Sequence, residues 1–101
     1  MPGPPDRHSL ERRWLDLTRI TLPALARERD FPVRADHCFQ RIFLDAACEG
    51  RWTDHVAGRP AYRCIDDAGL ARAIALAEAV IAGEADLHAL NRKSLAWRGK
   101  A

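Results

Sequence analysis

The stretch Asp36–Cys48, which reads DHCFQRIFLDAAC, decides the fold class of this chain. Its apolar residues recur at the spacing of one helical face: Phe39, Ile42, Phe43, Ala46 and Ala47. Asp36 belongs to a residue type that caps helix starts, and Gly50 is suited to a left-handed stop after the helix end. The stretch therefore predicts a mostly buried helix.

The chain before this helix predicts another helix that a proline interrupts. Its core-facing stripe follows spacings of three and four: Leu10, Trp14, Leu17, Thr21 and Leu25. Asp6 or Ser9 can cap its start. Because Pro23 lacks a backbone donor and clashes with the preceding turn, we expect a kink or break near residues 20–22. Thr21 would then cap a short second piece through Arg29.

The chain after this helix predicts a long loop and two more helices. Arg51–Ile65 contains Gly58-Arg59-Pro60 and keeps no period, so we expect a loop with one turn near residues 53–56. A helix capped by Asp66 or Asp67 and closed by Gly83 follows, and a last helix runs from about residue 85 to 99. No strand pattern is found. We predict an all-α fold: a single small domain of four to five packed helices with an irregular loop near residues 50–65.

Length and composition agree with one globular domain. The chain has 101 residues, 48% of them hydrophobic and 30% charged with both signs mixed. We expect residues 1–8 to be a flexible Pro/Gly leader and residues 9–101 to be the helical domain. The start of the chain lacks the apolar core of a signal peptide, and no run is long enough to span a bilayer. We therefore expect a cytoplasmic protein with no membrane partner.

The three cysteines and the histidines near them could suggest metal or thiol chemistry. Neither a CxxC pair nor a finger or ribbon spacing is present, and His37 and Cys48 lie roughly 16 Å apart along one helix. Adjacent His37 and Cys38 point in different directions on a helix, and no glycine-rich oxyanion loop lies beside a thiol. We therefore predict no metal, no cofactor, no catalytic residue and buried, inert thiols.

A polar edge on the Asp36–Cys48 helix is the first candidate site. His37, Arg41 and Asp45 follow one another at spacings of four. In one interpretation the edge is an internal network, with Arg41 paired by Asp45 or Asp36. In the other, His37 and Arg41 face outward and receive an anion, since the arginine fork matches phosphate or carboxylate.

The loop supplies cations interleaved with aromatic side chains. The predicted anion ligands there are Arg59 and Arg63, and Trp52 and Tyr62 offer faces on which a base could stack. The same aromatic residues could instead cover the core of a small domain. In the last helix Asn91, Ser94 and Arg98 form a polar line that could border the site or face water. After Asp86 the charged residues are all cations, which suits a helix C-terminus or an anionic partner.

Several segments resemble a family of short microbial proteins that are often labelled GCN5-related N-acetyltransferases. The resemblance covers nearly the whole chain from Leu10 onward. It is carried by residues 21–26 (TLPALA), by residues 36–39 (DHCF) with 41–42 (RI) and 44–45 (LD), by residues 59–63 (RPAYR), and by residues 90–91 (LN) with 94–100 (SLAWRGK). It implies an acetyl-CoA-dependent enzyme. That fold binds pyrophosphate through an Arg/Gln-x-x-Gly-x-Gly/Ala turn, and none of the six glycines has Arg or Gln three residues before it. No acetyl-CoA ligand is therefore carried over.

The sequence favours a small binding module over an enzyme. Its expected partner is anionic, a nucleic acid or a nucleotide phosphate, because a net charge of +2 is mild but arginines gather near aromatics. The predicted ligand-binding residues are His37, Arg41, Trp52, Arg59, Tyr62 and Arg63. An acetyltransferase-like enzyme and a subunit that docks on a protein partner or forms a homodimer are the alternatives.

Overall fold

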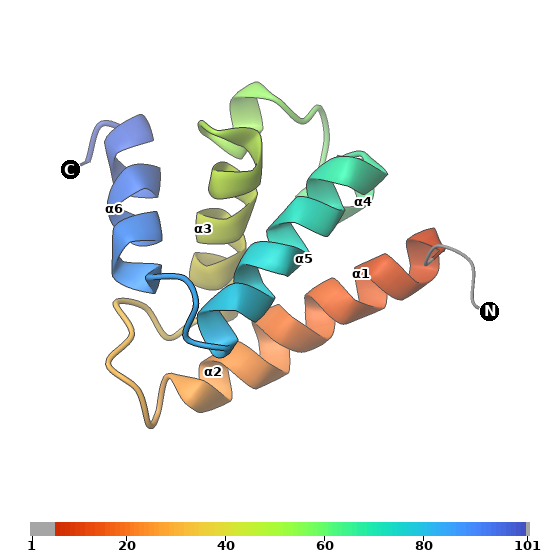
Figure 1. Ribbon diagram of the computed structural model, residues 1–101. Coiled ribbons are helices and arrows are strands. Elements are labelled where there is room, and N and C mark those ends of the chain that lie inside the picture. Colours follow the sequence, from red (N-terminus) through yellow and green to blue (C-terminus); the bar gives the residue numbers. More distant parts are fainter. Residues whose placement is uncertain (1–5, 101) are drawn as a thin grey trace.

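The structure is a computed structural model that describes residues 6–100, and every regular element in that range is helical (Figure 1). The elements are α1 (Arg7–Asp16), η1 (Leu17–Thr21), α2 (Leu22–Leu25), α3 (Asp36–Cys48), η2 (Trp52–Asp54), α4 (Ala61–Cys64), α5 (Asp67–Ile81) and α6 (Leu87–Trp97). The predicted all-α fold is confirmed. Residues 1–5 of the predicted leader, and residue 101, lie outside the described residues, and α1 begins at Arg7.

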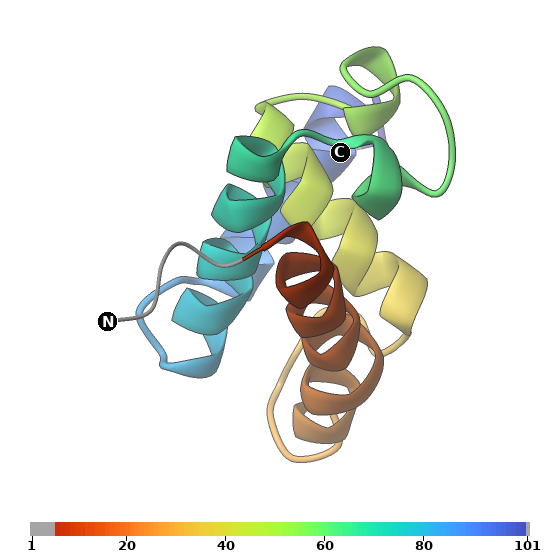
Figure 2. The same cartoon turned by 90° about the vertical axis from the view of Figure 1, so that its right-hand side faces the viewer.

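Helix α3 lies in the middle of the molecule. It packs against α5 on one side and against α6 on the other (Figure 1). Helix α1 packs on α5, and η1 and α2 reach α3; Figure 2 shows α1 in front with α5 and α3 to either side. The largest fully buried apolar side chains come from these elements: Trp14, Leu17, Leu22, Phe39, Ile42, Phe43 and Leu70. None of the helices in residues 6–100 has the length and hydrophobicity needed to cross a bilayer.

The first helical stretch continues through the proline without a break, and a distorted turn lies where the kink or break was expected. Residues Leu17–Thr21 form a π-helical turn that leads directly into α2, and Thr21 makes no capping bond. The Leu22 N–H donates to the Leu17 carbonyl, five residues back. This wider turn shifts the buried stripe by one position: Leu22 and Ala26 are buried instead of Thr21 and Leu25. It also precedes Pro23, where a regular α-helix would meet a clash.

Helix α3 has the predicted bounds but a different end. Glu49, with φ 54°, adopts the left-handed conformation that was expected of Gly50. Gly50 serves another purpose, since a Cβ at this position would lie 3.0 Å from the Nε2 atom of His55. The glycine therefore allows the chain to turn back closely against the loop. At the other end Ala35 precedes the helix without a side-chain cap, and Asp36 is its first residue.

The last two long helices follow the predicted signals. The Asp66 carboxylate accepts a hydrogen bond from the Gly69 N–H at 2.8 Å, and Gly83 ends α5 with a φ of 78°. Asp86 caps α6 by accepting from the His88 N–H at 2.9 Å. The turn expected near residues 53–56 corresponds to η2, which begins one residue earlier, and the loop before α5 is more ordered than predicted because the single turn of α4 also forms within it.

Candidate functional site

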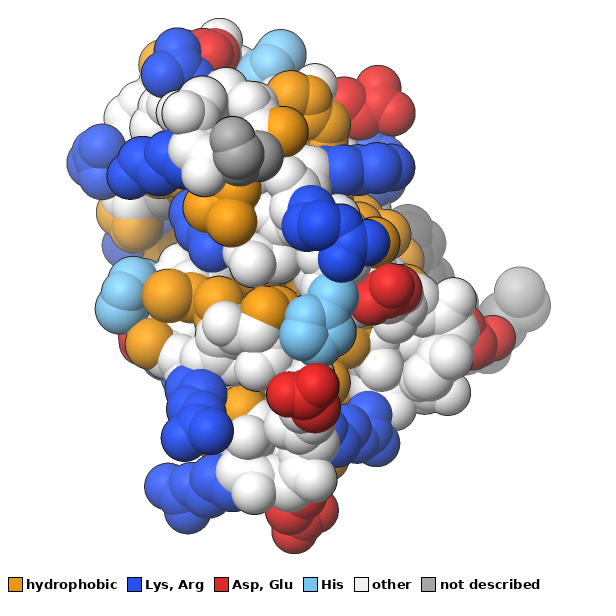
Figure 3. All heavy atoms as spheres, turned by 90° about the vertical axis from the view of Figure 1, so that its left-hand side faces the viewer, with side chains coloured by type: hydrophobic (Ala, Val, Ile, Leu, Met, Phe, Trp, Pro, Cys, Tyr) orange, Lys and Arg blue, Asp and Glu red, His pale blue; other side chains and the backbone are white. Residues whose placement is uncertain are grey.

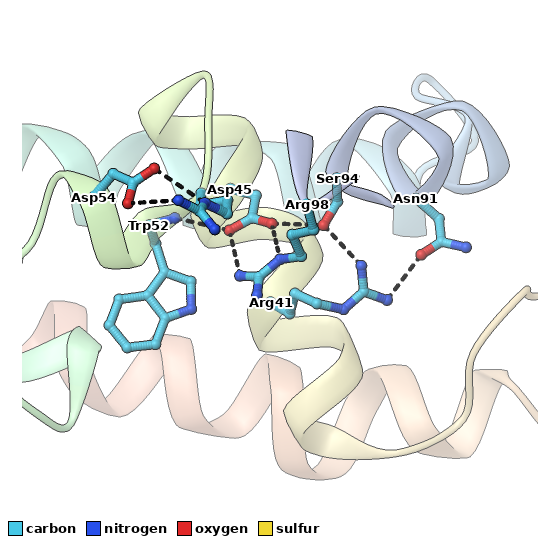
Figure 4. A network of polar contacts seen from close by, with 8 residues as sticks. Arg41, Asp45, Trp52, Asp54, Asn91, Ser94 and Arg98 are labelled. Atoms are coloured by element: carbon cyan, nitrogen blue, oxygen red, sulfur yellow. Dashed lines mark hydrogen bonds and ion pairs between the residues drawn. The ribbon is translucent and has the colours of Figure 1, made fainter. Parts of the chain in front are cut away.

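The six predicted site residues lie in two separate places. His37 and Arg41 lie on the first half of α3, whereas Trp52, Arg59, Tyr62 and Arg63 lie in the loop after α3 and in α4. The Arg41 side chain extends toward α6, and the Trp52 indole points away from it (Figure 4). The structure therefore divides the expected patch into a loop cluster and a helix junction.

The loop cluster consists of two guanidinium groups that each lie over an aromatic ring. Arg59 Cζ is 5.4 Å from the centroid of the Trp52 ring, and Arg63 Cζ is 5.9 Å from that of Tyr62. Both arginines are exposed, and neither makes an ion pair or side-chain hydrogen bond with residues 6–100. Arg51 differs, because its guanidinium binds the Asp54 carboxylate at 3.0 and 3.1 Å. Arg59 and Arg63 are thus the unpaired cations of the loop.

The surface beside Arg59 is hollowed. A depression of about 510 Å³ lies between η2 and the following loop, lined by Trp52, Thr53, Val56, Ala57, Gly58 and Arg59. The loop is attached to the helices at both ends. The Trp52 N–H donates to Asp45 at 2.9 Å, and the Arg7 guanidinium donates to the Tyr62 carbonyl. The aromatic and cationic groups are therefore presented by a loop that α1 and α3 hold in place.

The helix junction is a polar network between α3 and α6, and Asp45 is its centre (Figure 4). Asp45 is fully buried and accepts four hydrogen bonds: from the Trp52 N–H, the Ser94 hydroxyl at 2.6 Å, and Arg98 Nε and NH2 at 2.7 and 2.9 Å. The bidentate contact with this carboxylate raises the pKa of Arg98 above its usual value. One carboxylate thus joins α3, α6 and the loop.

Arg41 belongs to this network but pairs with neither Asp45 nor Asp36. Its NH1 donates to the Ser94 hydroxyl at 2.7 Å, and its NH2 donates to Asn91 Oδ1 at 2.9 Å. The internal interpretation of the polar edge therefore holds for Arg41, but its partners are Asn91 and Ser94 of the polar line on α6 and not the expected acids. Asn91, Ser94 and Arg98 all contact α3 side chains; Ser94 is fully buried, and Asn91 and Arg98 are half-buried.

His37 is not part of the network. Its side chain is 79% exposed, and Nδ1 lies 3.5 Å from an oxygen of neighbouring Asp36. It lies one turn before Arg41, at the start of α3. His37 therefore faces solvent, as the outward interpretation of the polar edge expected, but without the loop cations beside it.

The cysteines differ from the expectation that all three are buried. Cys38 and Cys48 are half-buried, and Cys64 is exposed. Burial, the main cause, together with nearby Asp45 raises the pKa of Cys48, which makes its thiolate scarce at neutral pH. Cys48, Cys64 and His55 line a groove of about 1030 Å³ between the end of α3 and α5. Even so, no three His, Cys, Asp or Glu side chains in the described chain form a metal-binding group.

The face that α6 presents is rich in cations. Arg92 and Lys93 are exposed on α6, and the described chain contains no acid after Asp86. In Figure 3, Lys and Arg side chains gather along the left of this face, around a central apolar and histidine region. Other Lys and Arg side chains lie at the right, and acidic side chains lie mainly toward the right and the bottom, with one at the top. The electrostatic character of this face favours anions.

No family model, curated protein or solved structure matches this chain. The resemblance to the acetyltransferase-labelled family stays a prediction, because no comparison tests it.

Proposed function

We propose that the protein binds an anionic partner, a nucleic acid or a nucleotide phosphate, through the loop cluster of Trp52, Arg59, Tyr62 and Arg63. One observation carries the proposal: two exposed guanidinium groups lie over aromatic rings, and neither has an acidic partner among residues 6–100. An arginine held over a ring keeps the edge of its donor fork free for phosphate oxygens. No other pair of loop residues combines these properties, since Arg51 is already bound to Asp54.

The surroundings of the cluster support a stacked base beside the phosphate. The depression next to Arg59 is bordered by Trp52, which packs in part against the core and has Arg59 over its ring, and a base that stacks on the exposed part of these groups contributes about 1–3 kcal/mol. The cationic α6 face would attract the same partner from a distance. The expected affinity is therefore sensitive to salt and tolerant of sequence.

The test is the binding of a fluorescent single-stranded oligonucleotide, measured by anisotropy over a range of salt concentrations. Replacing both Arg59 and Arg63 by Ala should weaken binding and lower the slope of log K against log salt by about 1 to 2. The matched control replaces Arg12 and Arg19, two exposed arginines outside the loop, and removes the same charge. Equal binding by the loop double variant and the wild-type protein would refute the proposal. A titration with ATP separates nucleotide binding from binding of a longer strand.

A further inference from the structure

The charges at the α3–α6 junction do not balance. Two guanidinium groups, Arg41 and Arg98, meet one carboxylate there. Both oxygens of Asp45 are already in use, since Oδ1 accepts from Trp52 and Arg98 and Oδ2 accepts from Ser94 and Arg98. The carboxylate is therefore fully engaged by Arg98 and the neutral donors, and it has no free position for Arg41.

Arg41 is held only by neutral oxygens. The Ser94 hydroxyl and the Asn91 amide accept its hydrogen bonds, and no carboxylate of residues 6–100 lies within ion-pair distance. Arg41 is half-buried, so water screens its charge less than it screens an exposed side chain. Neutral partners orient a guanidinium without cancelling its charge. The junction thus contains a fixed positive charge that lacks a counter-ion.

Donors remain free beside this charge. A guanidinium has five N–H bonds, and Arg41 uses its NH1 and NH2 for one contact each. Asn91 accepts through Oδ1, and its amide nitrogen has no hydrogen-bond partner in the described range. Because this nitrogen is bonded to the same carbon as Oδ1, it lies close to the guanidinium. Arg92 and Lys93 on the same helix add positive potential.

We propose that Arg41 and Asn91 form a second site, which binds a single carboxylate or phosphate group at the α3–α6 junction. The bound anion supplies the missing counter-charge and accepts hydrogen bonds from the free donors of both side chains. The site is independent of the loop cluster, because the Trp52 indole and the Arg41 guanidinium point in different directions (Figure 4). It suits one small anionic group and not an extended polyanion, since its donors are confined to one position between two helices.

Inorganic phosphate and acetate are the probes, and the readout is the side-chain Nε–Hε NMR signal of each arginine in the full chain. The Arg41 signal should shift and saturate with at least one of the two anions, and the preferred anion identifies the ligand class. The Arg98 signal should stay in place because the observed Nε–H itself donates to Asp45 at 2.7 Å. A shift of Arg41 that is linear in anion and no larger than that of exposed Arg12 would overturn the proposal.

Two variants distinguish an anion-binding role of Arg41 and Asn91 from a purely structural contact between α3 and α6. Arg41→Lys keeps the charge but loses the fork, and it should bind the anion about tenfold more weakly. Asn91→Asp introduces a permanent counter-charge of nearly the same shape. It should abolish anion binding and raise the thermal unfolding midpoint, so lost binding cannot be ascribed to unfolding. Anion binding by Asn91→Asp at wild-type strength would contradict the proposal.

The double variant of Arg59 and Arg63 tests the loop cluster and the junction site independently of each other. Replacing Arg59 and Arg63 by Ala should leave the anion-induced shift of Arg41 unchanged. If the wild-type protein binds no oligonucleotide but its Arg41 signal saturates with the small anion, the proposed function fails and the junction site stands. If that double variant abolishes the Arg41 shift, the junction is not a separate site and the inference fails.

Discussion

Helices α5 and α6 dock on the same helix, α3, by different means. Helix α5 buries six residues, all of them apolar or glycine, whereas α6 buries only Leu87 and Ser94. The α6 contact depends instead on the hydrogen bonds and the ion pair around Asp45. Apolar docking distributes its stabilisation over many weak contacts, while polar docking concentrates it in a few groups that must all be present. The α3–α5 interface should therefore tolerate single substitutions, whereas the α3–α6 interface should depend on each of its polar groups.

Removal of Asp45 should cause the largest loss of stability. Asp45→Ala leaves Arg98, Ser94 and the Trp52 N–H without their acceptor, and we expect a loss of about 3–5 kcal/mol in the free energy of unfolding. Urea unfolding followed by circular dichroism measures it. Amide exchange should accelerate first in α6 and at residues 52–54. A loss below about 1 kcal/mol, typical of an exposed ion pair, would show that the junction is not a concentrated contact.

A cavity in the apolar α3–α5 interface should lower the free energy of unfolding almost as much as the loss of Asp45, but it should destabilise more of the helices. Leu70 is fully buried in α5, and Leu70→Ala should lower the free energy of unfolding by about 2–5 kcal/mol. The expected exchange pattern is a loss of protection in α1, α3 and α5 together. The surface variant Ala71→Gly, one residue along the same helix, serves as a control near 1 kcal/mol. Protection lost only in α5 would erase the contrast with Asp45.

The polar interface can be converted to the apolar type. Asp45→Leu combined with Arg98→Met removes both charges, and we expect the double variant to lie within about 2 kcal/mol of the wild-type protein. It should be more stable than either single variant, because each single change leaves one charge of the Asp45–Arg98 pair without its partner. Thermal unfolding of the four proteins forms a double-mutant cycle. Additive losses in that cycle would mean that Asp45 and Arg98 do not act as a pair.

The exposed cap of α1 should respond to acid with the smallest effect. The Ser9 N–H donates to the Asp6 carboxylate at 2.8 Å, and this bond lowers the pKa of Asp6 below its usual 3.8. The cap therefore stabilises α1 above pH 3.8 and is lost as the pH falls through the lower folded-state pKa. An NMR titration of the Asp6 side chain should give a midpoint below 3.8 and fraying at the start of α1. A midpoint at or above 3.8 would show that the capping bond does not persist in solution.

Local patterns predicted the helices well because the residues that decide them are neighbours in sequence. The bounds of α3 follow from apolar spacing and the cap of α5 from Asp66, and α6 begins within two residues of the expected start, although its cap, Asp86, was not predicted. The single turn of α4 was missed because its four residues are too few to show a period. The left-handed residue was placed at Gly50 on propensity alone, whereas the close approach of His55, a tertiary contact, sets the role of that glycine.

The candidate site was predicted in composition but not in arrangement. Sequence reasoning found Arg41 and Asp45 on one edge and Asn91, Ser94 and Arg98 on another, and both sets lie in the junction. Which acid pairs with which arginine depends on how α3 and α6 are placed side by side. The same limit explains Cys64, whose exposure follows from the path of the loop.

The π-helical turn has a consequence for how this chain tolerates changes in length. Leu17 and Leu22 are both fully buried although five positions separate them, a spacing that places two residues on different faces of a regular α-helix. The wide turn therefore behaves as a one-residue insertion that the core already accommodates. Loss of one exposed residue from this turn, Arg19 or Ile20, would restore the ordinary spacing of four and keep the buried face in line, but it would also place Pro23 in a regular helix, where its ring clashes with the preceding turn. A deletion within α1 or α5 would instead rotate every following core residue out of place.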